Sequence, residues 1–191
     1  SEEIVTEYGV ATVPFPVHPL KTIQNSHPSP ATVYKGFWEI YKPIRTRLVN
    51  MIKAVDGVKQ YVVAGYSLGG IVATMICADP EGPDHKLTVL YTYAQCRIGN
   101  EAFIDLLQNL RWYKILNTAD MLPQIPFPIM PKFTGDFEPF VFANGGDNKI
   151  VFTINRGSYL KNHYPNAYSQ GIMGAYRPVN PASSKTLIAL R

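Results

Sequence analysis

Short apolar runs alternate with amphipathic segments through the middle of the chain. The runs at 60–65, 86–94 and 111–117 are rich in β-branched and aromatic residues, as strands buried in parallel sheets are. Between them, 69–79 and 99–110 carry apolar residues in a helical pattern. This alternation is typical of βαβ units. It predicts an α/β fold with a mostly parallel central sheet flanked by helices.

A further helix is predicted before the first strand, over residues 34 to about 54 and after Gly36. Pro43 falls in its first turns, where a helix tolerates proline. In the helix at 99–110, Asn100 is the expected N-cap. The apolar face of the first helix is expected to consist of residues that recur at three- and four-residue intervals: Phe37, Ile40, Tyr41, Ile44, Leu48, Met51 and Ile52.

The two ends of the chain are predicted to be less regular. Residues 1–31 are rich in proline, which removes backbone donors, so we expect an irregular N-terminal arm with one short edge strand between Ile4 and Val13. A proline-rich loop follows residue 117. Two β-rich runs then surround Asn144-Gly145-Gly146-Asp147, which predicts a C-terminal β-hairpin. The tail after Arg177 carries no pattern.

The composition favours one globular domain over residues 1–191, since 46% of the residues are apolar and 17% are charged. The formal charge of +4 comes from scattered lysines and arginines. Because they form neither a basic stripe nor a known module, we expect no nucleic-acid partner. Two interpretations of the charge stay open: ordinary solubility, and a mild attraction to an anionic membrane surface or substrate.

Nothing in the sequence fixes the compartment. Cys77 and Cys96 make neither a disulfide framework nor a zinc signature, and Cys77 is expected to be a small buried hydrophobe. No apolar stretch reaches the ~20 residues of a membrane span, and no signal peptide is visible. The chain begins with Ser1 rather than Met, so we expect residues to have been removed or left out ahead of it. Secreted and intracellular locations both fit.

A serine lies between glycines where the first predicted strand meets the next helix. Gly65-Tyr66-Ser67-Leu68-Gly69 is a G-x-S-x-G pattern, in which both glycines are expected because a Cβ would clash in the strained turn. Ser67 would stand at the carboxyl edge of the sheet, and the Leu68 N–H at the helix N-terminus could stabilise an oxyanion. A glycine-rich turn with a serine N-cap is the alternative. A phosphate-binding loop is disfavoured because both nucleotide-binding patterns are absent.

A nucleophilic serine needs a base. In the α/β-hydrolase order the acid and the histidine follow the serine, which leaves His85 and His163 and excludes His18 and His27. His85 comes too soon after the helix to return to Ser67, so we expect a solvated loop residue. His163 is predicted to lie in a loop after the last strand, and is the candidate base.

The acid must orient the imidazole and stabilise its charged form. Asp120 follows the carboxyl end of the strand at 111–117, so it is expected at the same sheet edge as Ser67. Asp120 is therefore the candidate acid and Asp136 is the reserve. The other carboxylates between Ser67 and His163 are Asp79, Glu81, Asp84, Glu101, Asp105, Glu138 and Asp147.

Five segments together resemble the class 3 lipases, a family of fungal-lipase-like α/β hydrolases. "VYKGFWEIY" resembles the family's "VHxGF", "VVAGYSLGGIVA" its "VTGHSLGGALA", and "LYTYAQCRIGNEAF" its "TFGxPRVGNxxF". "YKILNTADMLPQIP" resembles "RVVNxxDxVPxLP", and "NHYPNAYSQGI" the histidine segment near the family's end. The likeness runs in order over roughly residues 33 to 172. It implies that Ser67, Asp120 and His163 are the catalytic triad and that Leu68 provides one oxyanion donor.

Three departures from the family pattern stand out. Tyr66 replaces the usual histidine at a variable position, and Cys96 replaces a proline. The third concerns residues 1–33, which lack the G-[ST] pair that supplies the family's second oxyanion donor. Loss of one such donor costs about 10²- to 10³-fold in rate.

The resemblance and the ordered Ser/Asp/His set predict a serine carboxylic-ester hydrolase, a lipase or esterase that acts on acyl esters through an acyl-enzyme. The apolar segment 121–133 is expected to line an acyl groove, to seat the chain on a lipid surface, or to be a packed loop. Triacylglycerol, phospholipid and small soluble esters all stay open. No metal or organic cofactor is expected. The alternatives are a lipase-like binding module without chemistry and, with the same triad, a serine peptidase or thioesterase.

Overall fold

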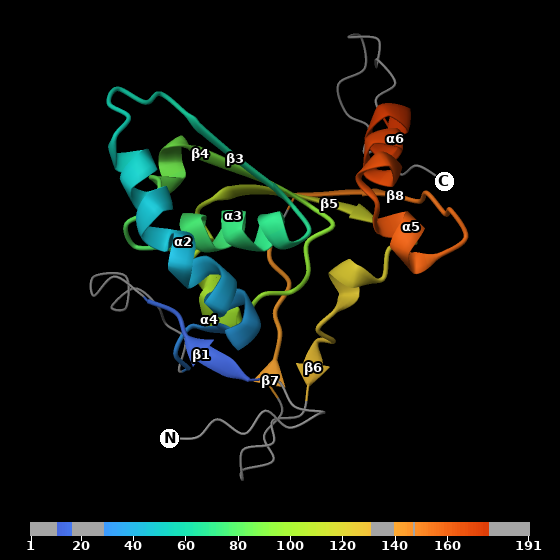
Figure 1. Ribbon diagram of the computed structural model, residues 1–191, viewed down its shortest axis with the longest axis horizontal. Helices are drawn as coiled ribbons and strands as arrows, with labels where there is room; N and C mark the ends of the chain where they lie inside the picture. The colour runs from blue at the N-terminus through green and yellow to red at the C-terminus, as the bar shows by residue number, and fades with distance from the viewer. Residues whose placement is uncertain (1–10, 17–28, 131–139, 147, 176–191) are drawn as a thin grey trace.

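The fold is built around a four-stranded parallel sheet. The computed structural model describes residues 11–16, 29–130, 140–146 and 148–175. The strands β3 (Tyr61–Tyr66), β4 (Thr88–Tyr93), β5 (Arg111–Asn117) and β8 (Asn148–Phe152) are hydrogen-bonded in that order, and each neighbouring pair is parallel (Figure 1). The α/β class and the parallel sheet predicted from the alternating pattern are confirmed.

Helices cover both faces of this sheet (Figure 1). On one face lie α2 (Lys35–Lys53), α3 (Leu68–Ala78) and α4 (Glu101–Asp105), which bury a core with Leu90 and Trp112 of the sheet. On the other face α6 (Pro165–Ala175) packs on β5 and β8, where Tyr168 meets Ile115 and Phe152. Alternate residues of β4 and β5 therefore belong to two separate cores, as the two-residue period of a strand requires. No helix within the described ranges is long and apolar enough to cross a membrane.

Two small antiparallel pairs lie beside the main sheet. β1 (Thr12–Pro14) pairs with β2 (Thr32–Tyr34), so Val13 lies in a short strand as expected, whereas Ile4 is outside the described residues. β6 (Ile129–Met130) pairs with β7 (Phe140–Val141). Short 3-10 turns at η1 (His85–Leu87) and η2 (Leu122–Gln124) precede β4 and follow β5.

The predicted C-terminal hairpin is wrong. β7 pairs with β6, while β8 joins β5 in parallel, with Ile115 opposite Ile150. The glycines between β7 and β8 do not form a tight turn. They allow the backbone to pass close to the Trp112 ring: a Cβ on Gly145 would lie 2.1 Å from that ring, and Gly146 has φ 83°. The segment 142–146 thus runs over the Trp112 ring from the small pair to the main sheet.

The buried face of α2 is rotated from the predicted one. Tyr41 and Val49 are fully buried, while Ile40, Ile44 and Met51 are exposed. Hydrogen bonds from α2 to Asp79 explain this rotation. Tyr41 Oη donates to Asp79 Oδ2 at 2.8 Å, and Arg45 forms a bidentate pair with the same carboxylate at the end of α3: Nε to Oδ2 at 2.6 Å and Nη2 to Oδ1 at 2.8 Å. These bonds turn the side of α2 that holds Tyr41 and Arg45 toward α3.

The outer edge of β3 has no neighbouring strand among the described residues. Val62 on this strand is 66% exposed, and Ala64 is exposed as well. The sheet therefore ends, in the described part of the chain, on the strand that leads directly into Ser67.

Candidate active site

Ser67 occupies a strained turn between β3 and α3. Its φ of 52° and ψ of −119° lie in a region that residues with a Cβ rarely adopt. The turn is held by the Ser67 N–H, which donates to the Tyr93 carbonyl at 2.8 Å, and by the Ser67 carbonyl, which accepts from Gly70 and Ile71. This geometry lifts the hydroxyl out of the sheet at its carboxyl edge.

Only one of the two glycines in the G-x-S-x-G pattern is required sterically. A Cβ on Gly65 would lie 2.2 Å from the carbonyl oxygen of Gly69, a contact with rigid backbone. A Cβ on Gly69 would meet nothing within 4 Å. The expectation that both positions exclude a Cβ is therefore wrong for Gly69, because the space that its Cβ would take is open.

Three predicted site residues meet at this edge. His163 Nε2 lies 2.8 Å from Ser67 Oγ, and His163 Nδ1 lies 2.7 Å from Asp120 Oδ2. His163 is the last residue of α5 (Tyr159–His163), whereas the sequence led us to expect a loop. Asp120 follows β5 and is only 1% exposed. Side chains separated by 43 and 96 positions in the chain thus form one continuous hydrogen-bonded row.

The buried Asp120 carboxylate has two further donors. Tyr168 Oη donates to Oδ2 at 2.7 Å, and the Leu122 N–H donates to Oδ1 at 3.0 Å. Burial, together with the bond to Asp120, raises the pKa of Tyr168 well above its usual range, so its hydroxyl stays a donor. These contacts satisfy the carboxylate in its charged form, as a buried anion requires.

Tyr66, which replaces the family's histidine, packs against the imidazole. Its ring centroid lies 5.3 Å from that of His163 and 5.8 Å from that of Tyr168. Burial, and then the charge of Asp120, raises the pKa of Tyr66 to about 12. The uncharged Tyr66 ring therefore packs against the His163 ring and limits the positions that the imidazole can adopt.

Two buried asparagines fix the loops that bring acid and base together. Asn117 donates to the carbonyls of Ile154 and Asn162 and accepts from the Ile154 N–H. Asn162 donates to the Ala119 carbonyl at 2.8 Å. The segments on either side of Asp120 and His163 are thus tied to each other by amide side chains next to the site.

The Leu68 N–H stands at the N-terminus of α3 beside Ser67, and it forms no hydrogen bond with a described residue. It is available as a donor toward an anion at Ser67 Oγ. We assign no second backbone donor among the described residues. Cys96, at the other departure from the family pattern, donates its thiol to the Leu122 carbonyl at 3.2 Å and so anchors the turn after Asp120.

The remaining candidates lie elsewhere. His85 is half-buried, with Nε2 2.6 Å from the Cys77 carbonyl, rather than solvated as expected. Asp79 is engaged by Arg45 and Tyr41. His18, His27 and Asp136 are outside the described residues. Within the ranges that the structure describes, no group of three or more His, Cys, Asp or Glu residues is arranged to hold a metal ion.

Sequence reasoning missed Tyr168, Asn117 and Asn162. Asn162 directly precedes His163 and Asn117 ends a predicted strand, so each lay within a segment already singled out. Tyr168 is one of 12 tyrosines, and no spacing rule distinguishes it. Only the helix that follows His163 brings it back to Asp120.

Comparison with known proteins identifies relatives. A family model described as "Lipase (class 3)" matches residues 7–130. The chain is 33% identical over 95 residues to "Toxin TseL" of Vibrio cholerae, covering 49% of this chain and 15% of that protein. It is 32% identical over 95 residues to "Secreted mono- and diacylglycerol lipase A" of Penicillium cyclopium, covering 48% and 31%. A Rhizomucor miehei lipase–propeptide complex is 27% identical with a TM-score of 0.50, covering 68% of this chain and 41% of that one. The chain thus spans less than a third of the length of these two curated relatives.

Proposed function

The chain belongs to the class 3 lipase family, and from that premise we propose that it is a serine ester hydrolase whose nucleophile is Ser67. The observation that carries the proposal is the unbroken row Ser67–His163–Asp120, with contacts of 2.8 Å and 2.7 Å. A serine hydroxyl is a weak nucleophile until a positioned base removes its proton.

In the proposed reaction His163 Nε2 takes the proton from Ser67 Oγ as the oxygen attacks the ester carbonyl. Asp120 holds the proton on Nδ1, keeps the correct tautomer and stabilises the imidazolium. His163 then gives the proton to the leaving alcohol, and an acyl-enzyme forms. Water, deprotonated by His163, attacks the acyl carbon and releases the acid together with free Ser67.

The developing oxyanion would lie at the N-terminus of α3. There the Leu68 N–H and the helix dipole favour negative charge. The resemblance to the family implies a second backbone donor, and we assign none among the described residues. With Leu68 as the one assigned donor, we expect the oxyanion to be incompletely stabilised and the rate to be lowered accordingly.

We propose lipid acyl esters as the substrate class. The relatives named above include a mono- and diacylglycerol lipase. The segment after Asp120 supports lipid contact, because it exposes large apolar side chains: Met121 is 63% exposed, Phe127 59% and Ile129 64%. Exposed apolar groups beside a hydrolytic site favour association with a lipid surface, where each loses contact with water.

The test is covalent labelling with a fluorophosphonate together with hydrolysis of a short p-nitrophenyl ester. The unaltered protein is expected to react with both. Ser67→Ala is expected to lose labelling and to lose hydrolysis by at least about 10³-fold, as removal of a triad member does. Ser169→Ala, at an exposed serine on α6, is the matched control and should leave both unchanged.

Two results would contradict the proposal. Labelling that persists in Ser67→Ala would place the reactive serine elsewhere. Absence of labelling in folded, unaltered protein would favour the alternative of a lipase-like binding module. If labelling succeeds, a panel of acylglycerols, phospholipids, thioesters and peptides separates lipase from thioesterase or peptidase activity.

A further inference from the structure

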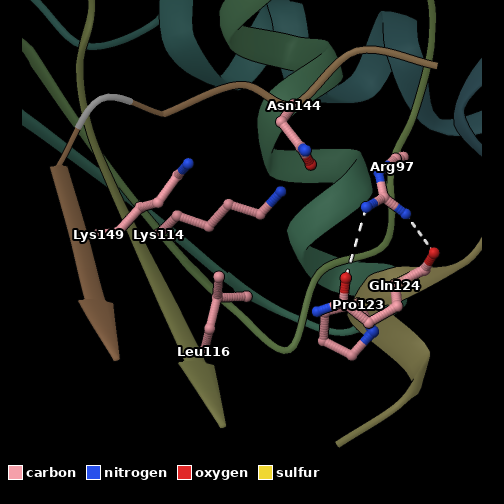
Figure 2. A pocket seen from close by; sticks show the side chains of 7 residues that line it. All are labelled: Arg97, Lys114, Leu116, Pro123, Gln124, Asn144 and Lys149. Carbon is pink, nitrogen blue, oxygen red and sulfur yellow. Dashed lines mark hydrogen bonds between the residues drawn. The ribbon is translucent and has the colours of Figure 1, made fainter. Parts of the chain in front are cut away.

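A cavity of about 200 Å³ lies beside β5 and β8, on the face of the sheet where Trp112 is buried. Its walls carry three basic side chains, Arg97, Lys114 and Lys149, together with the amides of Asn144 and Gln124 (Figure 2). None of the described residues that line it is acidic. The walls do not include Ser67, Asp120 or His163, so the cavity is distinct from the proposed hydrolytic site.

Lys114 is the least expected of these residues. It is 3% exposed, yet its ammonium has no hydrogen-bond or ion-pair partner among the described residues. Its Nζ lies 5.9 Å from the centroid of the Trp112 ring, which is a favourable contact for a cation. Figure 2 shows the side chain extending from β5 toward Asn144 and Arg97. A cationic side chain that is buried without an anion beside it is costly, so the part of the site that the structure describes would be stabilised by a bound anion.

Arg97 is held rigidly at the opposite wall. Its Nη1 donates to the carbonyls of Gln124 and Pro126, while its backbone N–H donates to the Ile125 carbonyl at 3.1 Å. It is 7% exposed, and its buried Nε has no partner among the described residues. These bonds are to neutral carbonyls, so they position the guanidinium without neutralising it.

Lys149 brings a third positive charge from the neighbouring strand. It lies directly opposite Lys114 in the β5–β8 register, and like charges in this arrangement repel. Burial, then the charges of Arg97 and Lys149, lowers the pKa of Lys114 to about 8. Lys149 itself is exposed, which gives the cavity a side open to solvent.

We propose that this cavity binds a phosphate group between Lys114, Lys149 and Arg97. A tetrahedral dianion offers acceptors in several directions and matches donors that converge from two strands and a loop. One water molecule takes up about 30 Å³ in the liquid, so the volume accommodates a phosphate with some of its hydration. The group can come from free phosphate, from a soluble phosphomonoester or from a lipid headgroup.

The experiment compares thermal unfolding in inorganic phosphate with unfolding in sodium chloride of equal ionic strength, and measures the affinity by titration calorimetry. Phosphate is expected to raise the Tm of the unaltered protein, because a ligand that binds only the folded state stabilises it. Lys114→Met should abolish the rise. Lys149→Met, at an exposed position where folding is not at risk, should weaken the phosphate Kd by about tenfold, equivalent to the loss of one charged contact. Lys59→Met, at an exposed lysine before β3, is the matched control and should bind as the unaltered protein does.

Equal Tm values in phosphate and chloride for the unaltered protein would overturn the proposal, as would a rise that survives in both Lys114→Met and Lys149→Met. Two further ligands identify the source of the group. Glycerol 3-phosphate tests a soluble phosphomonoester, and flotation with phosphatidic acid vesicles against phosphatidylcholine vesicles tests a lipid headgroup. Binding of either that is lost in Lys114→Met assigns the source, and an effect of inorganic phosphate alone assigns the free ion.

Discussion

At the scale of single residues, the strained turn at Ser67 depends on one glycine more than on the G-x-S-x-G pattern as a whole. Ser67 keeps a positive φ because β3 and α3 approach closely behind it, and Gly65 is the residue that permits this approach. Gly69 stands in the first turn of α3 with open space around it. The two glycines are alike in the motif but differ in physical role.

This difference predicts opposite results for the same substitution. Gly65→Ala should displace Ser67 and reduce ester hydrolysis by at least about 10²-fold, the cost of a misplacement of about 1 Å. Gly69→Ala should leave hydrolysis within about twofold and raise the free energy of unfolding by about 0.5–1 kcal/mol, because alanine favours a helix. Hydrolysis rates and urea unfolding of both variants check this. Equal loss of activity in the two would contradict the steric account.

At the scale of elements, α6 completes the site from the far face of the sheet. It positions Tyr168 against Phe152 and so directs a hydroxyl at the same Asp120 oxygen that faces His163. Through Tyr168, the helix therefore links the apolar cluster around Ile115 and Phe152 to Asp120, the acid of the proposed triad.

Tyr168→Phe should lower kcat for ester hydrolysis about threefold to tenfold with little change in KM, as expected for one hydrogen bond of roughly 0.5–1.5 kcal/mol. A change in KM with kcat unaltered would contradict this role. Tyr159→Phe, at an exposed tyrosine of α5, is the control.

Elements with strong local patterns were predictable, and elements fixed by distant contacts were not. The strands β3, β4 and β5 and the helix α3 match the expectation because buried apolar runs of this length have few other structures. The Asn100 N-cap was also predicted, and its side chain accepts from the Phe103 N–H at 3.1 Å. The hairpin prediction was wrong because β8 pairs with β5, for example Ile115 with Ile150, and the residues of a local turn carry no information about so distant a partner.

The helices α5 and α6 around His163 were not predicted from the sequence, for a different reason. The segment from Tyr159 to Ala175 contains Pro165 and several polar residues, which weaken the apolar period. Pro165 in fact begins α6, a position where proline is favoured because no N–H is needed there. Three of the proposed site residues could still be chosen from chain order, whereas Tyr168 required the helix itself.

At the scale of the whole molecule, buried charge should be visible in the pH dependence of stability. The pKa of Lys114 falls from an ordinary value of 10.5 to about 8. Between these values the unfolded chain holds a proton that the folded protein has released, so this group makes stability rise with pH. Below pH 8 the full cost of burying the charged form is present.

Lys114→Met should therefore be more stable than the unaltered protein in phosphate-free buffer near neutral pH, by up to about 3 kcal/mol, and the gap should close toward pH 10.5. Urea unfolding of both proteins across this range measures the gap. The comparison must be between the two proteins because burial raises the pKa of Cys77 and Tyr66, which gives the opposite slope in both. A gap that stays constant with pH would contradict the assignment.

The outer side of β3, which has no neighbouring strand among the described residues, has a consequence for how the protein behaves at high concentration. Within the ranges that the structure describes, no strand pairs with this side of β3, next to Val62 and Ala64, and such an edge is a template on which another extended segment can be added. If this edge is open in solution, the chain is expected to associate edge to edge as its concentration rises. Because β3 leads directly into the turn of Ser67, the proposed nucleophile, such association would restrict access to the proposed site, and the turnover per molecule would fall as the concentration rises.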